Sequence, residues 1–272
     1  MRFILLLLCL QSTALCAAPR VVTSIAPLQE ITAAIMMDIA APELIIDNRA
    51  SIHHFAFKPS HMRRLQQADL VIWIDRNFEA GFNRVPESLP ATTRRLELLP
   101  ALGIDPGQGH IWFSPTLLMQ AVETISGTLQ EMDPDNRDAY RENSDRMLAA
   151  ISAWQVKVRN QLQAMQPRYA TDHAFLEHFE RDMGVTAVAM IQDRHDDHGS
   201  LRDLRRVEKL LQQNPAACLL TAEPPVNSLA HSLAQKYQLK IIDISAMPTI
   251  DQGQARFLQR LEGLIRGLNA CR

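Results

Sequence analysis

Short apolar runs alternate with amphipathic stretches of helical spacing along most of this chain. The clearest run, residues 69–74, is apolar at every position after its first, which is typical of a strand buried on both faces of a parallel sheet. A β-branched run at residues 20–25 precedes it, and further runs follow in the second half. Helical stretches separate these runs, so the pattern predicts an α/β fold with a small parallel sheet in each half.

The expected elements follow from this alternation and from the proline and glycine positions that interrupt it. We expect strands at 20–25, 43–46, 69–74, 93–98, 169–171, 185–190, 217–221 and 240–244. We expect helices at 28–37, from 59, from 115, at 173–183, 200–213, 226–237 and 253–268.

One long stretch departs from the alternation. Residues 135–165 contain no proline, are highly charged and carry an apolar stripe at helical spacing. A helix of this size would be on the order of 45 Å long, enough to run the length of a two-domain protein. We therefore interpret residues 133–166 as a connecting helix between an N-terminal α/β lobe at 19–132 and a C-terminal α/β lobe at 167–272. Two shorter helices with a break between them are the alternative.

The first eighteen residues do not fit this fold. A basic start, an apolar run at residues 3–10 and small residues up to 18 are the plan of a secretory signal peptide, and the run is too short for a stable membrane span. Acylation at Cys16 is the alternative, which the bulky Leu15 disfavours. We expect an exported soluble protein. The chain has a net charge of −2, so it has no excess of basic residues of the kind that a nucleic-acid partner would require.

Two cysteines, Cys218 and Cys271, lie beyond the predicted signal peptide. An even pair in an oxidising compartment favours a disulfide, which would tie the C-terminal tail to a predicted strand. Two unpaired buried thiols are the alternative.

Three histidines, His53, His110 and His173, each lie at the edge of an apolar run. In open parallel sheets, ligands bind beyond the carboxyl ends of the strands, and His53 and His110 both follow predicted strands. Three imidazoles favour zinc, and Asp243, at the end of the last predicted strand, could add an oxygen ligand. Hard carboxylate and carbonyl ligands would suit manganese or calcium better. Core histidines with satisfied ring nitrogens are the alternative to a metal site.

The motifs of common enzymes are missing from the sequence. It contains no Gly-x-Ser-x-Gly, no His-Glu-x-x-His and no glycine-rich phosphate loop. We therefore expect a binding protein and no catalytic residues. A zinc hydrolase is the alternative, with Glu177 or Glu223 as the candidate general base.

The histidine motifs resemble those of the ZnuA-type solute-binding proteins, the metal-binding components of bacterial zinc-uptake ABC transporters. His53, followed six residues later by Pro59-Ser60, resembles the first ligand motif of that family. His110 begins a match to the second, His-x-Trp-x-x-Pro, and His173, six residues before Phe179, is similar to the third. The resemblance extends over most of the mature chain, at residues 24–28, 68–73, 222–224 and 242–243.

The resemblance implies two α/β lobes joined by one long rigid helix, with the metal site in the interlobe cleft and small lobe movements on binding. It implies His53, His110, His173 and Asp243 as metal ligands. It further implies a monomeric periplasmic receptor that captures Zn²⁺ as its transported ligand and delivers it to an ABC transporter membrane permease. A manganese or iron receptor of the same fold is the alternative. Some members have a disulfide where the two cysteines stand.

The sequence departs from the family pattern in three places. Gln108 stands where the family often has Asp. After the third histidine, where an acidic or small residue is usual, the sequence has Ala174, and the acidic residue stands before the histidine instead. Asp172 precedes that histidine and is therefore a rival for the third ligand position. The long His-rich loop of many zinc receptors is also missing from the sequence.

Other histidines lie outside the three motifs. The segment His195-Asp196-Asp197-His198 predicts either a second, weaker metal site or a solvated polar loop. His54 neighbours a predicted ligand and could orient or replace it. We assign the remaining ones to surface or supporting positions: His61, His178 and His231.

Overall fold

The computed structural model describes residues 17–46, 55–192, 201–222, 228–244 and 256–271. These residues form two four-stranded parallel sheets with equivalent strand orders, β2-β1-β3-β4 and β6-β5-β7-β8. The first sheet consists of β1 Val21–Thr23, β2 Glu43–Leu44, β3 Leu70–Trp73 and β4 Arg94–Glu97. The second consists of β5 Tyr169–Thr171, β6 Ala189–Met190, β7 Cys218–Thr221 and β8 Lys240–Asp243. The strand order reverses beside β1 and beside β5, which are the points where such sheets bind ligands.

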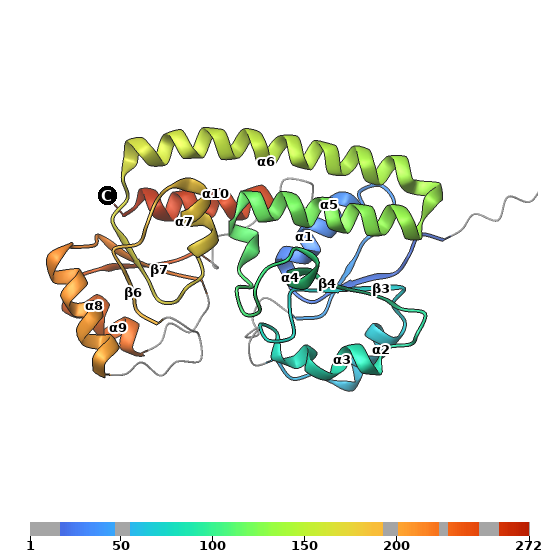
Figure 1. Cartoon of the computed structure of the whole chain (residues 1–272), viewed down its shortest axis with the longest axis horizontal. Helices are drawn as coiled ribbons and strands as arrows, with labels where there is room; N and C mark the ends of the chain where they lie inside the picture. The colour runs from blue at the N-terminus through green and yellow to red at the C-terminus, as the bar shows by residue number, and fades with distance from the viewer. Residues whose placement is uncertain (1–16, 47–54, 193–200, 223–227, 245–255, 272) are drawn as a thin grey trace, which may run out of the picture.

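Helices flank both sheets (Figure 1). The α-helices are α1 Ala26–Ile35, α2 Pro59–Gln66, α3 Val85–Ser88, α4 Leu98–Ala101, α5 Pro115–Met132, α6 Arg137–Met165, α7 Glu177–Met183, α8 Leu201–Gln213, α9 Ser228–Lys236 and α10 Arg256–Asn269. Three short 3₁₀ helices are η1 Ala80–Arg84, η2 Ile111–Phe113 and η3 Pro134–Asn136. The α/β fold with two small parallel sheets is therefore confirmed. None of the described helices is both long and apolar enough to cross a membrane.

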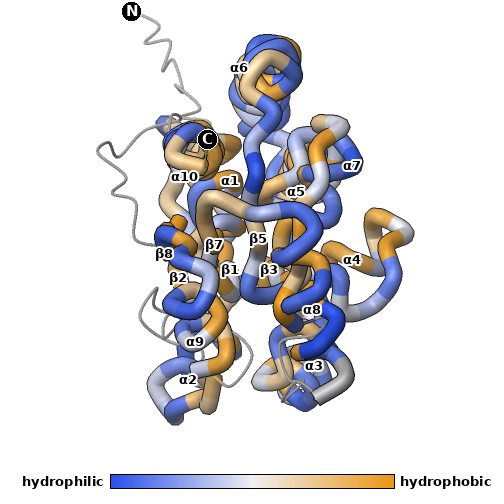
Figure 2. Tube along the Cα trace, turned by 90° about the vertical axis from the view of Figure 1, so that its left-hand side faces the viewer, coloured by the Kyte–Doolittle hydropathy of each residue, from blue (hydrophilic) through white to orange (hydrophobic). Residues whose placement is uncertain are grey.

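The long helix α6 is a single element of 29 residues, so the alternative of two shorter helices is wrong. It runs along the molecule past both sheets (Figure 1) and lies at one edge in the view along the long axis (Figure 2). One stripe of its side chains is buried, from Tyr140 to Leu162. The helix ends where Gln166 adopts a left-handed conformation before Pro167, which cannot continue the hydrogen-bonding pattern.

Two predicted elements of the second lobe are shorter than expected. The helix predicted at 173–183 begins only at Glu177, because the Asp172 side chain accepts the His173 N–H and a tight turn follows. The strand predicted at 185–190 is reduced to Ala189–Met190. The backbone N–H of Ala187 instead donates to the Glu180 carboxylate, 3.0 Å away.

The two lobes share most of their hydrophobic core. One continuous apolar cluster includes the first sheet, α5, α6, α10 and one face of the second sheet. A smaller cluster fills the other face of the second sheet, against α8 and α9. A partly buried ion pair also joins the lobes, since Arg260 of α10 donates to both carboxylate oxygens of Glu30 in α1, at 3.1 and 2.7 Å.

The predicted disulfide is present. Cys218 of β7 is bonded to Cys271, which follows α10, with their Cα atoms 5.2 Å apart. It fastens the end of the chain to the second sheet, as expected, and the alternative of two unpaired thiols is wrong.

Candidate metal centre

Two of the predicted ligands meet between the lobes. The Nε2 atoms of His110 and His173 are 3.4 Å apart, although 63 residues separate them in the chain. Both residues are buried, with 7% and 3% of their surface exposed. The structure therefore brings together two imidazoles from different lobes and directs the same ring nitrogen of each toward the other.

His173 is held by the residue beside it. It lies on the turn that follows β5, at the carboxyl edge of the second sheet. The Asp172 carboxylate oxygen Oδ1 accepts both the backbone N–H of His173 and a hydrogen bond from its Nδ1, each at 2.9 Å. A carboxylate on Nδ1 orients the ring and makes Nε2 the nitrogen available for coordination. Asp172, the predicted rival ligand, therefore contacts the Nδ1 side of the His173 ring, whereas Nε2 faces His110.

His110 is held by residues distant in the sequence. It lies in the segment that follows β4, with the helix α4 and a loop between that strand and His110. Its ring packs edge-on against Phe78, with centroids 4.9 Å apart, and lies 5.2 Å from Trp112. Gly109 lies so close to Phe78 that a Cβ atom at this position would overlap the Phe78 ring.

Aromatic side chains line the histidine pair. The Phe175 ring centroid is 5.0 Å from that of His173 and 6.2 Å from that of His110. Together with Phe78 and Trp112 it surrounds the imidazoles with aromatic rings. Sequence reasoning missed Phe78 and Phe175, because an isolated aromatic residue carries no motif.

The first predicted ligand, His53, lies outside the described residues, as do His54, Glu223 and the segment 195–198. Asp243 is described: it ends β8, is half-buried and pairs with Thr221 of β7. Asp172 donates its backbone N–H to Leu220, the residue before Thr221. Asp172 and Asp243 therefore flank β7 at the same edge, with backbones roughly 10 Å apart.

The separation of the two Nε2 atoms matches what a zinc ion requires. Zn²⁺ binds imidazole nitrogen at about 2.0–2.1 Å in tetrahedral geometry, which places two such nitrogens about 3.3–3.4 Å apart. The observed value is 3.4 Å. Within the described ranges, no group of three or more His, Cys, Asp or Glu side chains is arranged to hold a metal. The described part of the centre therefore contains two imidazole nitrogens at a spacing that a metal ion could bridge.

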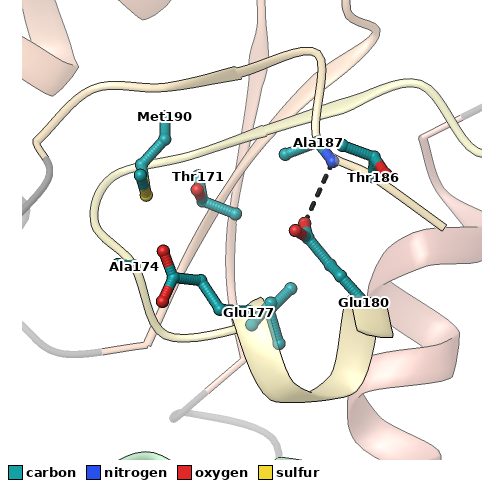
Figure 3. A pocket seen from close by; sticks show the side chains of 8 residues that line it. Thr171, Ala174, Glu177, Glu180, Thr186, Ala187 and Met190 are labelled. Carbon is teal, nitrogen blue, oxygen red and sulfur yellow. Dashed lines mark hydrogen bonds between the residues drawn. The ribbon is translucent and has the colours of Figure 1, made fainter. Parts of the chain in front are cut away.

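A small cavity of about 150 Å³ lies behind the turn that carries His173 (Figure 3). Glu177 and Glu180 of α7 line it, together with Ala174, the neighbour of His173. Burial raises the pKa of Glu180, whose carboxylate accepts from Tyr169 and from the backbone of Ala187. Neither His110 nor His173 lines this cavity.

A buried carboxyl group supports the loop that carries Phe78. Glu79 is completely buried and accepts from the backbone N–H groups of Ile74 and Asp75, at 2.6 and 3.4 Å. Burial raises the pKa of Glu79 to about 7, and these hydrogen bonds and the Ser24 hydroxyl oppose the shift only in part. The fold thus buries a carboxyl group of raised pKa next to Phe78, the residue that packs against His110.

Comparison of the sequence with known proteins finds similarity to metal-binding proteins. A family model described as the periplasmic component A of a zinc-uptake complex, ZnuA, matches residues 21–271. The high-affinity zinc uptake protein ZnuA of Yersinia pestis is 25% identical over 244 residues, which are 76% of this chain and 76% of that protein. The iron-binding protein YfeA of Yersinia pestis is 27% identical over 207 residues, 72% of this chain and 66% of that protein.

The fold is also similar to that of a solved structure. A crystal structure of ZnuA superposes with a TM-score of 0.79, covering 94% of this chain and 100% of that chain. The sequences are 19% identical, so this likeness concerns the fold alone.

Proposed function

The chain belongs to the ZnuA family of periplasmic zinc-uptake components, and from that premise we propose that it captures Zn²⁺ and delivers it to the permease of an ABC transporter. The family and the fold are those of metal-binding transport receptors. The observation that carries the proposal is the 3.4 Å separation of the His110 and His173 Nε2 atoms, which fits tetrahedral zinc.

The proposed ligand set is His53, His110, His173 and Asp243, with water completing the coordination where Asp243 does not reach the ion. Two nitrogens come from opposite lobes, so the bound ion bridges them. His173 is the better prepared ligand, because Asp172 already holds its Nδ1. Residues 1–18 are the proposed export signal, which would place the receptor in the periplasm beside its permease.

Zinc capture depends on neutral imidazoles. Protons and zinc compete for the same ring nitrogens, so zinc affinity should fall as the pH drops.

The direct test is calorimetric titration of the metal-stripped mature protein with zinc, and with manganese in parallel. We expect one tight zinc equivalent and weak manganese binding, and an increased melting temperature when zinc is bound. Tight manganese and weak zinc would instead support a manganese or iron receptor of the same fold. Metal-dependent turnover of ester, peptide or phosphate substrates would support the hydrolase alternative.

Replacing either histidine tests the ligand assignment. His110→Ala and His173→Ala should each weaken zinc binding by more than about 100-fold, because even partners that only support a ligand contribute roughly 10–100-fold. His231→Ala, at an exposed position of α9, is the matched control and should bind like the wild type. Wild-type affinity in His110→Ala would refute the site.

A further inference from the structure

The short helix α7 contacts the segment that carries His110 on both sides of that histidine. Nε2 of His178 donates to the carbonyl oxygen of Gln108, 3.0 Å away and two residues before His110. The Asp182 carboxylate accepts from the Ser114 hydroxyl at 2.5 Å and from the Thr116 backbone N–H at 3.0 Å. The partners are 66 to 70 residues apart in the chain.

The surroundings of Asp182 and His178 stabilise these contacts. Ser114 is the N-cap residue of α5, so Asp182 lies at the N-terminus of an 18-residue helix, where unpaired N–H groups and the helix dipole stabilise a carboxylate. Arg159 of α6 donates to the backbone carbonyl of Asp182 at 2.8 Å, which ties α7 to the long helix. His178 is buried, and Arg181 contacts its Nδ1 at 3.4 Å.

The same helix is joined to the other histidine through the chain. α7 begins four residues after His173. The helix α7 is therefore linked to His173 by a short stretch of chain, and it is hydrogen-bonded to the backbone segment on either side of His110. Metal ligands bind tightly only when supporting residues hold them near the productive geometry, within about 0.5 Å.

We propose that α7 is a clamp that sets the separation of the His110 and His173 Nε2 atoms, with Asp182 and His178 as its positioning residues. The inference rests on the proposed zinc-receptor function. Neither residue needs to touch the metal. They act by fixing the backbone on either side of His110, so that zinc meets the two nitrogens already at coordination distance.

General rigidity of the interlobe contact does not account for this local effect. The Glu30–Arg260 ion pair and the shared apolar cluster also join the lobes. The ion pair, however, connects α1 to α10, and neither of its residues is hydrogen-bonded to residues 108–116 in the described structure. Loss of the clamp should therefore change metal geometry, whereas loss of packing elsewhere should change stability alone.

The test is Asp182→Ala, measured by zinc titration and by the visible absorption of the Co²⁺-loaded protein, which reports coordination geometry. We expect roughly tenfold weaker zinc binding and an altered Co²⁺ spectrum. Ser114→Ala should cause a similar loss, and the double variant should lose little more than Asp182→Ala alone, because both changes remove the hydrogen bond between the Ser114 hydroxyl and the Asp182 carboxylate.

The control is Asn143→Ala. Asn143 of α6 donates to the carbonyls of Ile35 and Met37, at 2.9 and 3.0 Å, near the end of α1. Its loss should lower the melting temperature of the metal-free protein and leave zinc affinity and the Co²⁺ spectrum unchanged.

Each outcome separates the clamp from the receptor function. Wild-type zinc affinity and an unchanged Co²⁺ spectrum in Asp182→Ala would overturn the clamp while leaving the receptor intact. A wild-type protein that binds no zinc would overturn the receptor function itself. If Asp182→Ala does not fold, Ser114→Ala carries the same test, since it removes the hydroxyl donor and keeps the carboxylate.

Discussion

The two histidines of the proposed centre are held in different ways. His173 follows a strand and is oriented by its neighbour Asp172, through two hydrogen bonds to one oxygen. His110 lies in an irregular segment whose position depends on Phe78 and on α7 of the other lobe. His173 is thus oriented by its neighbour in the chain, whereas His110 is positioned by tertiary contacts. Damage to remote packing should therefore affect His110 first.

The largest expected effect concerns Glu79, the buried neighbour of Phe78 in the chain. Its folded-state pKa of about 7 lies above the ordinary carboxyl value of 4.5, so the folded protein binds more protons than the unfolded chain between these values. Stability should therefore fall as pH rises from about 4.5 to 7, by about 3 kcal/mol at 1.36 kcal/mol per pKa unit. Chemical denaturation of metal-free protein across this range measures it.

The variant Glu79→Gln should remove that pH dependence, because the amide oxygen can still accept from Ile74 and Asp75 but does not ionise. Glu87→Gln, at an exposed carboxylate of the same lobe, is the control and should retain the wild-type slope. Parallel pH profiles for wild type and Glu79→Gln would contradict the assignment.

A somewhat smaller effect is expected from Gly109→Ala. The added methyl group would overlap the buried Phe78 ring and displace His110, and overpacking of this kind costs about 1–3 kcal/mol. Zinc affinity should fall by up to about 100-fold, measured by competition with a chelating dye. Phe78→Leu in the same protein should recover part of the loss, since it makes room for the methyl group. A tight-binding Gly109→Ala would show that Phe78 does not position His110.

The smallest effect is expected at His173, which its neighbour Asp172 orients. Asp172→Asn keeps the shape and one acceptor oxygen but removes the charge behind His173, so zinc binding should weaken about tenfold. The melting temperature of the metal-free protein should change little, in contrast with Gly109→Ala. If Asp172→Asn instead abolished binding, Asp172 would be a direct ligand rather than a support.

Local features of this molecule were predictable from the sequence, and tertiary ones were not. The apolar run at 69–74 predicted a buried strand because both sheet faces are covered, and the proline-free stretch at 135–165 predicted α6. The start of α7 was predicted wrongly, since residues 173–176 are compatible with a helix and only the Asp172 side chain diverts them. The contacts of Asp182 and His178 join segments whose proximity no local pattern records.

The continuity of the main apolar cluster determines how the molecule melts. Because side chains from both sheets and from α6 belong to one cluster, separating the lobes would expose a large apolar surface to water. Neither half is therefore a folding unit, and the metal-free protein should unfold in one calorimetric transition despite its two sheets. The region around α8 and α9, which packs in its own small cluster, is where amide hydrogen exchange should first report partial opening.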